Sequence, residues 1–492
     1  MVNRVTISDI IPESDMLSWV MEDKVLINAP TGAGKSYFVI TRLNDYAEIT
    51  HNKILFLTNR KLLMKQIEED IKLKPNITAL SYHQLIEILK RGKFNIDRFK
   101  YVVADECHFF FSDSNFNAET DIALHYLINL KNNIAIFLSA TCETFKEYMK
   151  VINKNIKLYI LNNELVYENL YYYNSDETII EMINNQPPEE KIIMFCNDAT
   201  KALIMHKQMK SDSSFLCSEN NSKFKFSDKN VRYQIVEDSK FDSRTLFTTK
   251  VLDNGINIKD EQLKHIIVDI YDFDTIQQCI GRKRIQNEND KPNIYIRKFK
   301  QNSIQSYLNQ WNKIFEYGQY FLNSTPEDYI NVHSRKNTNG LIYNIQEDKT
   351  VALKLNDALY YKLQSDIELA KQITDTNKQL TNKLGHLQIL CDRYRIPISE
   401  FKCLDDIITT ETFNEQLIKF IDIKMFKDEK NVFKKFIKAN AIKTVDKNHK
   451  SLGVNTINGY FADNKIKYRV ESIQETYGEN KGKRYWKLFD MT

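Results

Sequence analysis

Over the first 300 residues, short apolar runs alternate with longer stretches that have helical spacing. Four of these runs lie between residues 24 and 140: Val25–Asn28, Ile54–Leu57, Tyr101–Ala104 and Ile134–Leu138. Each run is too short for a helix, and none alternates apolar with polar residues, which is typical of strands buried on both faces of a parallel sheet. The pattern therefore predicts an α/β unit over residues 24–160.

A second series of the same kind begins at Lys191–Cys196 and continues through Thr245–Thr249 and His265–Asp269. It predicts a second α/β unit, which joins the first near residues 160–175. We therefore expect two domains of this class, one over residues 1–163 and the other over residues 164–300.

The pattern changes after residue 300. Helical spacing dominates Phe299–Phe426, for example at Leu359, Leu363, Ile367 and Leu369, and predicts a helical accessory domain over residues 301–423. Residues 424–492 predict a small α+β module with helices at 432–442 and 456–461, strands at 467–473 and 483–489, and a turn at 478–482. A winged helix is one fold open to this module.

Composition adds exclusions to this picture. Hydrophobic residues make up 42% of the 492 residues and charged residues 27%, as in an ordinary globular protein. The longest uncharged apolar stretch, Ile134–Ala140, is too short to cross a bilayer, and the N-terminal residues lack the apolar core of a signal peptide. The seven cysteines include no C-x-x-C pair, which argues against a zinc site or a disulfide framework. We expect a soluble cytosolic protein with no membrane partner.

Charge is distributed unevenly along the chain. The net charge is +4, but residues 424–492 hold 16 Lys and Arg against 8 Asp and Glu, a local net charge of +8. A basic module on a nearly neutral body predicts a polyanion partner for that module. The alternative is a solvated basic surface.

The segment Ala29–Ser36 reads Ala-Pro-Thr-Gly-Ala-Gly-Lys-Ser, follows a predicted strand and opens a predicted helix. In that position the backbone N–H groups and the helix dipole favour a phosphate. Lys35 would reach the β and γ oxygens of a nucleotide, and the Ser36 hydroxyl would bind Mg²⁺. The residues expected to bind the nucleotide are Thr31, Gly32, Ala33, Gly34, Lys35 and Ser36.

An acidic pair, Asp105 and Glu106, ends another of the predicted buried strands. A carboxylate at the carboxyl end of a parallel strand can face the phosphate loop, because ligands bind at that edge of the sheet. Asp105 is therefore expected to hold Mg²⁺, directly or through water. Glu106 is expected to orient and deprotonate the attacking water.

With these two motifs the chain resembles a superfamily 2 helicase of the DExH-box type with a restriction-helicase motor. Other segments resemble the remaining motifs in the family's order: Leu57–Gln66 (motif Ia), Ser81–Leu85 (a backbone-contacting segment), Ser139–Thr141 (motif III), Ile192–Asn197 (motif IV), Thr248–Ile258 (motif V) and Gln277–Arg284 (motif VI). The resemblance covers residues 20–300. It implies two tandem RecA-like motor domains with ATP and Mg²⁺ as cofactors.

The resemblance also implies roles for individual residues. Gln278, Arg282 and Arg284 would face the γ-phosphate across the cleft between the domains, and Gly255 of motif V would contact the nucleotide. An arginine from the second domain stabilises transition-state charge only when the cleft closes. Arg284 follows Gly281 by three residues instead of the family's four, which leaves the choice of arginine finger open between Arg282 and Arg284. We find no glutamine motif before residue 25 for reading adenine, and ATP is the default nucleotide.

Motif positions place Thr58, Arg60, Gln84 and Thr249 on the phosphate backbone of a nucleic acid. Hydroxyl, amide and guanidinium groups at such positions fix the register of the strand without reading its sequence. Each residue also has a structural alternative, because such side chains often cap helices.

In the basic module, Lys483 and Arg484 lie next to the predicted turn and are expected to contact phosphates. Tyr485 and Trp486 follow them directly, which suits base stacking. The alternative is an ordinary structural hairpin with both aromatic side chains in a small core.

The sequence therefore predicts an ATP-dependent helicase or translocase acting on nucleic acid, with DNA favoured over RNA. The composition and the basic module suggest replication, recombination or defence in a phage or mobile element of the bacterial cytosol. Three alternatives stay open: an RNA helicase, an ATPase that clamps nucleic acid without unwinding it, and the motor subunit of a restriction or defence complex. Protein partners would bind through the C-terminal region.

Overall fold

The computed structural model describes residues 5–59, 70–92, 94–114, 117, 120–161, 165–209, 211–250, 257–333, 340–347, 350–440 and 452–491. One compact unit comprises Met1–Asn174 and Ile183–Lys402, and the other comprises Ser175–Met182 and Cys403–Thr492. In the described part of the chain, no helix is long and apolar enough to cross a membrane.

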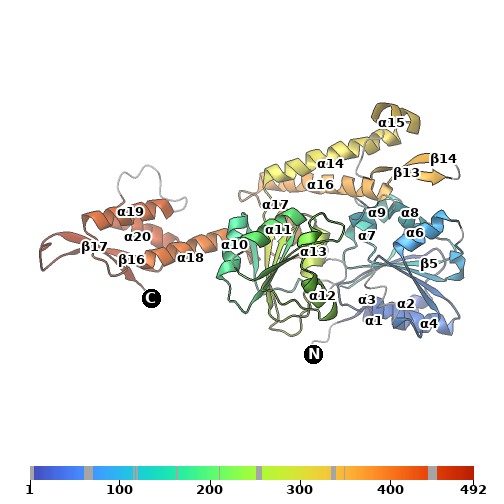
Figure 1. Cartoon of the computed structure of the whole chain (residues 1–492), viewed down its shortest axis with the longest axis horizontal. Helices are drawn as coiled ribbons and strands as arrows, with labels where there is room; N and C mark the ends of the chain where they lie inside the picture. Colours follow the sequence, from blue (N-terminus) through green and yellow to red (C-terminus); the bar gives the residue numbers. More distant parts are fainter. Residues whose placement is uncertain are drawn as a thin grey trace. The chain divides into compact units, whose positions relative to one another are not determined.

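The first unit begins with a parallel sheet whose described strands run in the order β3-β2-β4-β5-β1-β6 (Figure 1). In chain order these strands are β1 (Lys24–Asn28), β2 (Ile54–Thr58), β3 (Ile77–Ser81), β4 (Tyr101–Asp105), β5 (Ile134–Ser139) and β6 (Lys157–Ile160). The strands β1, β2, β4 and β5 confirm the four predicted runs. The sequence pattern missed β3 and β6, which lie at the two edges and keep partly exposed residues.

Successive residues of the central strands enter two different cores. Leu26, Leu55 and Val102 pack in the core that α6 to α9 cover, whereas their neighbours Val25 and Ile54 pack in the core that α1 to α4 cover. These helices are α1 (Ile7–Ile10), α2 (Glu13–Leu17), α3 (Lys35–Phe38), α4 (Asn44–Ile49), α6 (Tyr82–Lys90), α7 (Phe109–Ser112), α8 (Thr120–Ile128) and α9 (Glu143–Val151). The sheet is buried on both faces, as its uninterrupted apolar runs predict.

A second sheet follows, with the described strands in the order β15-β7-β12-β11-β8-β10-β9. Its strands are β7 (Leu170–Tyr173), β8 (Lys191–Cys196), β9 (Ser213–Leu216), β10 (Thr245–Thr249), β11 (Leu263–Asp269), β12 (Asn293–Arg297) and β15 (Phe401–Cys403). In this sheet order, every pair of neighbouring strands from β7 through β12, β11, β8 and β10 to β9 is parallel. Its helices are α10 (Asp176–Asn185), α11 (Ala199–Gln208), α12 (Lys229–Glu237) and α13 (Phe273–Ile280). The two tandem parallel sheets confirm the predicted RecA-like fold class.

A group of helices follows the second sheet in the chain, and two of them pack against the cores of the two sheets. They are α14 (Gln301–Leu322), α15 (Pro326–His333), α16 (Asp357–Gln379) and α17 (Gly385–Tyr394), with a hairpin of β13 (Ile342–Glu347) and β14 (Thr350–Leu355) between α15 and α16. Figure 1 shows α14 and α16 side by side. Ala358 of α16 belongs to the core under the first sheet, and Leu387 of α17 belongs to a core of the second sheet. Domain boundaries at 163, 300 and 423 stay predictions.

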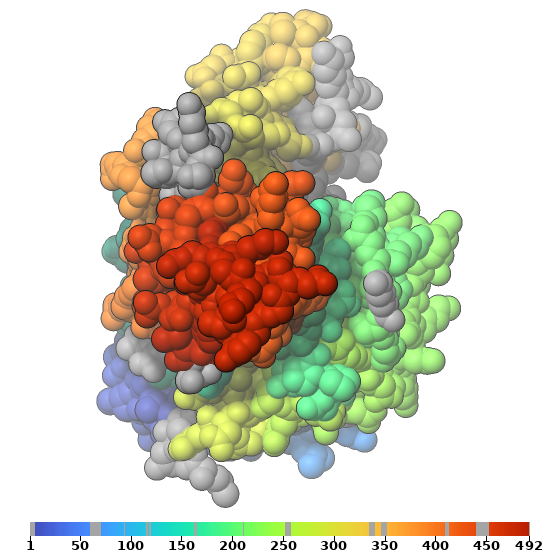
Figure 2. All heavy atoms as spheres, turned by 90° about the vertical axis from the view of Figure 1, so that its left-hand side faces the viewer, coloured from blue at the N-terminus to red at the C-terminus, as the bar shows by residue number. Residues whose placement is uncertain are grey.

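The second unit contains residues 176–182 of α10, α18 (Leu404–Ile418), α19 (Lys427–Asn440), α20 (Val454–Asp463) and the antiparallel strands β16 (Tyr468–Gln474) and β17 (Arg484–Asp490). Met425 pairs with Trp486 of β17 in an antiparallel bridge between α18 and α19. For this unit the winged helix stays a prediction. In Figure 2 the C-terminal strands, in red, form the surface of this unit that faces the viewer.

Candidate nucleotide site and nucleic-acid interface

The phosphate loop follows β1 and leads into one continuous helical stretch. Gly32 and Gly34 have φ angles of 85° and 80°, a backbone conformation that favours glycine. Lys35 is buried, and its Nζ donates to the carbonyl oxygens of Ala29 at 2.8 Å and Pro30 at 3.2 Å. Those carbonyls hold the ammonium group over the loop, where phosphate oxygens would replace them. Thr31, Ala33 and Ser36 belong to the same loop, and their contacts with a nucleotide stay a prediction.

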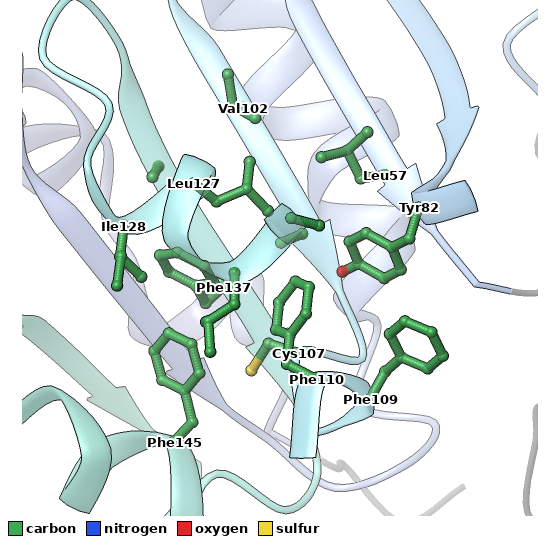
Figure 3. Packing of buried hydrophobic residues seen from close by; sticks show 14 of the residues in the cluster. Leu57, Tyr82, Val102, Cys107, Phe109, Phe110, Leu127, Ile128, Phe137 and Phe145 are labelled. Carbon is green, nitrogen blue, oxygen red and sulfur yellow. The ribbon is translucent and has the colours of Figure 1, made fainter. Parts of the chain in front are cut away.

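The acidic pair lies at the carboxyl end of β4. Both Asp105 and Glu106 are buried, and Glu106 has a φ of 53°, which is strained for a residue with a side chain. The Tyr82 hydroxyl donates to the Asp105 carbonyl oxygen at 2.8 Å. Figure 3 shows Tyr82 together with Phe109 and Phe110, whose rings pack around the segment that follows β4. This packing holds the strained turn in place.

A polar chain leads from Glu106 to the end of β5. Nδ1 of His108 lies 3.2 Å from Glu106 Oε2 and 2.9 Å from Ser139 Oγ. Ser139 Oγ in turn accepts from the Thr141 backbone N–H at 3.1 Å. All of these side chains are buried. These contacts connect Glu106 to residues 139–141 at the end of β5.

Three hydrogen bonds join the phosphate loop and residues 140–141 to α13 and the residue after it. Nε2 of Gln278 donates to Thr141 Oγ1 at 3.0 Å, and Nε2 of Gln277 donates to the Ala140 carbonyl oxygen at 2.9 Å. Thr31 Oγ1 of the phosphate loop donates to the Gly281 carbonyl oxygen at 3.2 Å. The predicted motifs I, III and VI therefore meet in one place.

The two arginines after α13 have different surroundings. Arg282 is almost fully buried, and its Nε donates to the Gln278 carbonyl oxygen at 3.1 Å. Arg284 Nε donates to Asn257 Oδ1 at 2.7 Å, and its Nη1 lies 2.9 Å from where a Cβ on Gly32 would be. The Arg284 guanidinium group thus lies against the phosphate loop.

Lys283, between the two arginines, has a structural role that the sequence analysis missed. Its Nζ pairs with Asp290 Oδ1 at 2.6 Å and donates to the Asp260 carbonyl oxygen at 2.9 Å. Burial lowers the pKa of Lys283, whereas Asp290 opposes that shift. The Lys283 partners Asp260 and Asp290 are 23 and 7 positions away along the chain, so no local pattern pointed to this role.

A cavity of about 580 Å³ lies next to the phosphate loop. Its polar wall includes Thr31, Gln277 and Arg284, and its apolar wall includes Ile160, Leu161 and Ile280. A mostly apolar cavity with a few polar groups at one end is the usual form of a small-molecule site. Its place beside the loop suits the base and ribose of a nucleotide.

Ser36 and Asp105 are the residues that would hold Mg²⁺. No group of three His, Cys, Asp or Glu side chains that could bind a metal occurs among the described residues. A hydroxyl and one carboxylate still fit Mg²⁺, because this ion usually takes one or two protein carboxylates and fills its octahedron with water and substrate phosphates. The donor set therefore fits a cation that arrives with the nucleotide.

The predicted nucleic-acid residues differ in their surroundings. Thr58, the last residue of β2, is buried, and its hydroxyl has no hydrogen-bond partner among the described residues. Gln84 Oε1 accepts from the Ser81 backbone N–H at 2.7 Å in a capping box at the start of α6. Thr249 ends β10. The predicted sites Arg60 and Gly255 lie outside the described residues.

In the basic module, Lys483 and Arg484 are exposed, but Tyr485 and Trp486 are each only 8% exposed. Trp486 packs in a core with Phe433 and Leu488. The structure therefore favours the alternative in which these two aromatics stabilise the hairpin. Tyr477, which the sequence analysis did not select, is 82% exposed in the turn between β16 and β17.

The sequence model of one protein family, described as "Type III restriction enzyme, res subunit", matches residues 13–79. Solved structures that align with the chain include S. cerevisiae Dbp5 bound to RNA and ADP BeF3, at 17% identity over 57% of this chain and 81% of that one, with a TM-score of 0.42. A DEAD box protein from Methanococcus jannaschii aligns at 16% identity over 56% and 82%, with a TM-score of 0.31. Escherichia coli DEAH/RHA helicase HrpB aligns at 14% identity over 56% and 40%, with a TM-score of 0.37. No curated protein sequence matches the chain.

Gly281 offers a direct test of how the phosphate loop meets α13. A Cβ here would lie 2.8 Å from Thr31 Oγ1 and 3.2 Å from the Gln277 carbonyl oxygen, so Gly281→Ala must push the two apart. We expect its turnover number for ATP to fall at least about 10-fold, because misplacing reacting groups by about 1 Å can cost about 100-fold. With turnover measured in the absence of nucleic acid, Gly459→Ala is the control, because a Cβ there meets nothing within 4 Å. Equal turnover in both variants would contradict the described contact.

Proposed function

We propose that the chain is an ATP-dependent nucleic-acid motor of helicase superfamily 2. The observation that carries this proposal is the meeting of the phosphate loop, residues 139–141 and α13 through three hydrogen bonds from two domains. Such a site is complete only when the domains are together. Its chemistry is therefore tied to a movement, as a motor requires. The restriction-enzyme family match, which spans the phosphate loop, supports the same conclusion.

In the proposed reaction a water molecule attacks the γ-phosphorus of ATP, and the bond from that phosphorus to the β–γ bridging oxygen breaks. Glu106 accepts the proton of the water, and ADP and phosphate leave. Lys35 and the loop N–H groups hold the phosphates, and Mg²⁺, which Ser36 and Asp105 would hold, would supply further positive charge to them. Arg284 is the proposed arginine finger, because it lies against Gly32, and Gln278 fixes α13 in the closed position.

We propose DNA as the nucleic acid. The winged-helix order of the C-terminal unit presents α20 as the second helix of a helix-turn-helix, the element that enters a major groove. The major groove of B-DNA admits an α-helix, whereas that of an A-form RNA duplex is too deep and narrow for side chains to read. Exposed residues of α20 such as Asn455 suit such a contact. Thr249, Arg60 and Gln84 are proposed to contact the strand in the motor.

We also propose a reducing compartment, the cytosol, for the chain. Six of the seven cysteines are buried in the structure. Burial is the largest cause that raises the pKa of the Cys107 thiol, which keeps it neutral beside the acidic pair. These cysteines are therefore core residues, and none of them acts as a nucleophile in the proposed reaction.

Nucleic-acid-stimulated ATP hydrolysis tests the proposed function. We expect single-stranded or duplex DNA to raise turnover, because a strand bound across both domains favours the closed cleft.

Lys35→Ala should abolish hydrolysis, and Glu106→Gln should lower turnover at least about 100-fold while ATP still binds, since the general base is lost. Arg284→Ala should lower turnover more than Arg282→Ala does.

Near-normal turnover in Glu106→Gln would contradict the catalytic assignment. Stimulation by RNA alone would favour the RNA helicase. A strand-displacement assay on tailed duplexes then separates unwinding from the clamp and from translocation without unwinding, because only a helicase releases the displaced strand.

The wing between β16 and β17 is proposed to bind DNA through exposed Lys483 and Arg484, with Tyr477 stacking on a base. Reversing both charges with K483E and R484E should weaken DNA binding and flatten its salt dependence, because fewer counterions are released. Made alone, Tyr477→Ala should also weaken DNA binding. Tyr477→Phe should keep the parental affinity, since phenylalanine keeps the ring. Affinity titrations across a salt series measure all three.

The matched control reverses the exposed Lys371 and Lys378 of α16 to glutamate, which changes the net charge by the same amount. Equal loss of affinity in the control and in the wing variant would mean that overall charge, and not the wing, determines binding. Parental affinity in the wing variant would make the hairpin a structural element or a protein-docking surface.

A further inference from the structure

Two cations from the accessory helices hold the first turn of α13. Lys362 of α16 lies with its Nζ 3.1 Å from Asp272 Oδ2, and it also pairs with Asp366 one turn further along α16. Asp272 is the N-cap of α13, where its Oδ1 accepts from the backbone N–H and the hydroxyl of Thr275, each at 2.8 Å. One carboxylate therefore caps the helix and binds the lysine at the same time.

The second cation is Arg393 of α17. Its Nη2 lies 2.6 Å from Asp274 Oδ1, and the other oxygen of Asp274 accepts from Thr144 Oγ1 at 3.3 Å. Thr144 lies in the first turn of α9, in the first domain. Asp274 thus joins three elements: α13 of the second domain, α9 of the first domain and the accessory helix α17.

These contacts lie one helical turn from the nucleotide site. Thr144 follows Thr141 by three residues, and Asp274 precedes Gln278 by four, which places it on the same face of α13. The hydrogen bond between Thr144 and Asp274 therefore runs alongside the one between Thr141 and Gln278. A shift of the first turn of α13 would move Gln278, Gly281 and Arg284 together.

The helix α16 can fix the position of the first turn of α13, because α16 packs against both domains. Ala358 and Tyr361 pack with the core under the first sheet, and Ile367, Ala370 and Ile373 pack with Tyr271 and Phe299 of the second domain. Lys362 lies between these anchors with its side chain 15% exposed. Burial opposes its charge, but Asp272 and Asp366 outweigh burial and hold the pKa of Lys362 above its ordinary value.

We propose that Lys362 and Arg393 are positioning residues for ATP hydrolysis, which set the first turn of α13 so that Gln278 and Arg284 reach the phosphate loop. This inference rests on the proposed ATPase function. Neither residue touches the reacting atoms, so their effect is on turnover and not on nucleotide binding. The accessory helices are then part of the catalytic apparatus.

The test compares Lys362→Met, Lys362→Arg and Arg393→Gln in the full chain with saturating DNA, by the turnover number, the KM for ATP and the thermal midpoint. We expect Lys362→Met and Arg393→Gln to lower turnover at least about 10-fold with the KM changed less than about 2-fold. Lys362→Arg should restore most of the turnover, because it keeps the charge between the two aspartates.

Lys354→Met is the control. Lys354 of β14 pairs with buried Asp121 of α8 at 3.3 Å and so also joins the accessory region to the motor, but away from α13. It should lower the thermal midpoint and leave turnover unchanged. If Lys362→Met is too unstable, Thr144→Val removes only the bond to Asp274 at nearly constant volume, and turnover should fall at least about 3-fold with the KM unchanged.

The outcomes separate this inference from the proposed function. Normal turnover in Lys362→Met, Arg393→Gln and Thr144→Val would overturn the inference and leave the ATPase function standing. A rise in KM equal to the loss of turnover would overturn it too, because the residues would then shape the binding site. A parent protein that does not hydrolyse ATP would overturn the proposed function itself.

Discussion

The hydrogen bond from Gln278 to Thr141 is the contact on which the rest of the nucleotide site depends. Both side chains are buried, and they come from different domains. On one side Thr141 leads through Ser139 and His108 to Glu106. On the other side Gln278 lies in the helix that ends next to Arg284. One contact therefore links the proposed general base to the proposed arginine finger. A buried amide left without its partner would cost about 1 to 3 kcal/mol, which favours the joined arrangement.

Apolar packing and polar contacts contribute differently to this arrangement. The apolar residues of α16 and α17 enter the cores of both domains and bring the domains close together, but such packing is not directional. The ion pairs of Lys362 and Arg393 are directional, and a buried cation is tolerated only beside its carboxylates. Packing thus sets how near the two sheets lie, and the polar contacts set which turn of α13 faces the phosphate loop. Apolar packing and polar contacts also have separate roles at Glu106. Aromatic packing around Tyr82 holds the strained turn, and that turn orients the Glu106 carboxylate.

The sequence predicts those parts of the molecule whose signal is local. Four central strands follow from uninterrupted apolar runs, and the phosphate loop follows from its glycines and Lys35 between a strand and a helix. The edge strands β3 and β6 lack that signal, because all of their residues except Ile77 are only partly buried or exposed. Lys362 and Asp272 are 90 positions apart, so no spacing rule connects them. The sequence places Tyr485 and Trp486 beside basic residues, which is equally compatible with stacking on bases and with packing in the core of the hairpin. Only the burial of both, and the exposure of Tyr477, separates the two readings.

A double-mutant cycle on Thr141 and Gln278 tests the central claim most directly. The turnover number for DNA-stimulated ATP hydrolysis would be measured for Thr141→Val, Gln278→Leu and the double variant. If the contact between these side chains links the two catalytic groups, the double variant should be no slower than the slower single variant, with a coupling energy of about 2 kcal/mol. If the effects of the two substitutions simply multiply, the residues act independently. The account of a site assembled across the two domains would then be wrong.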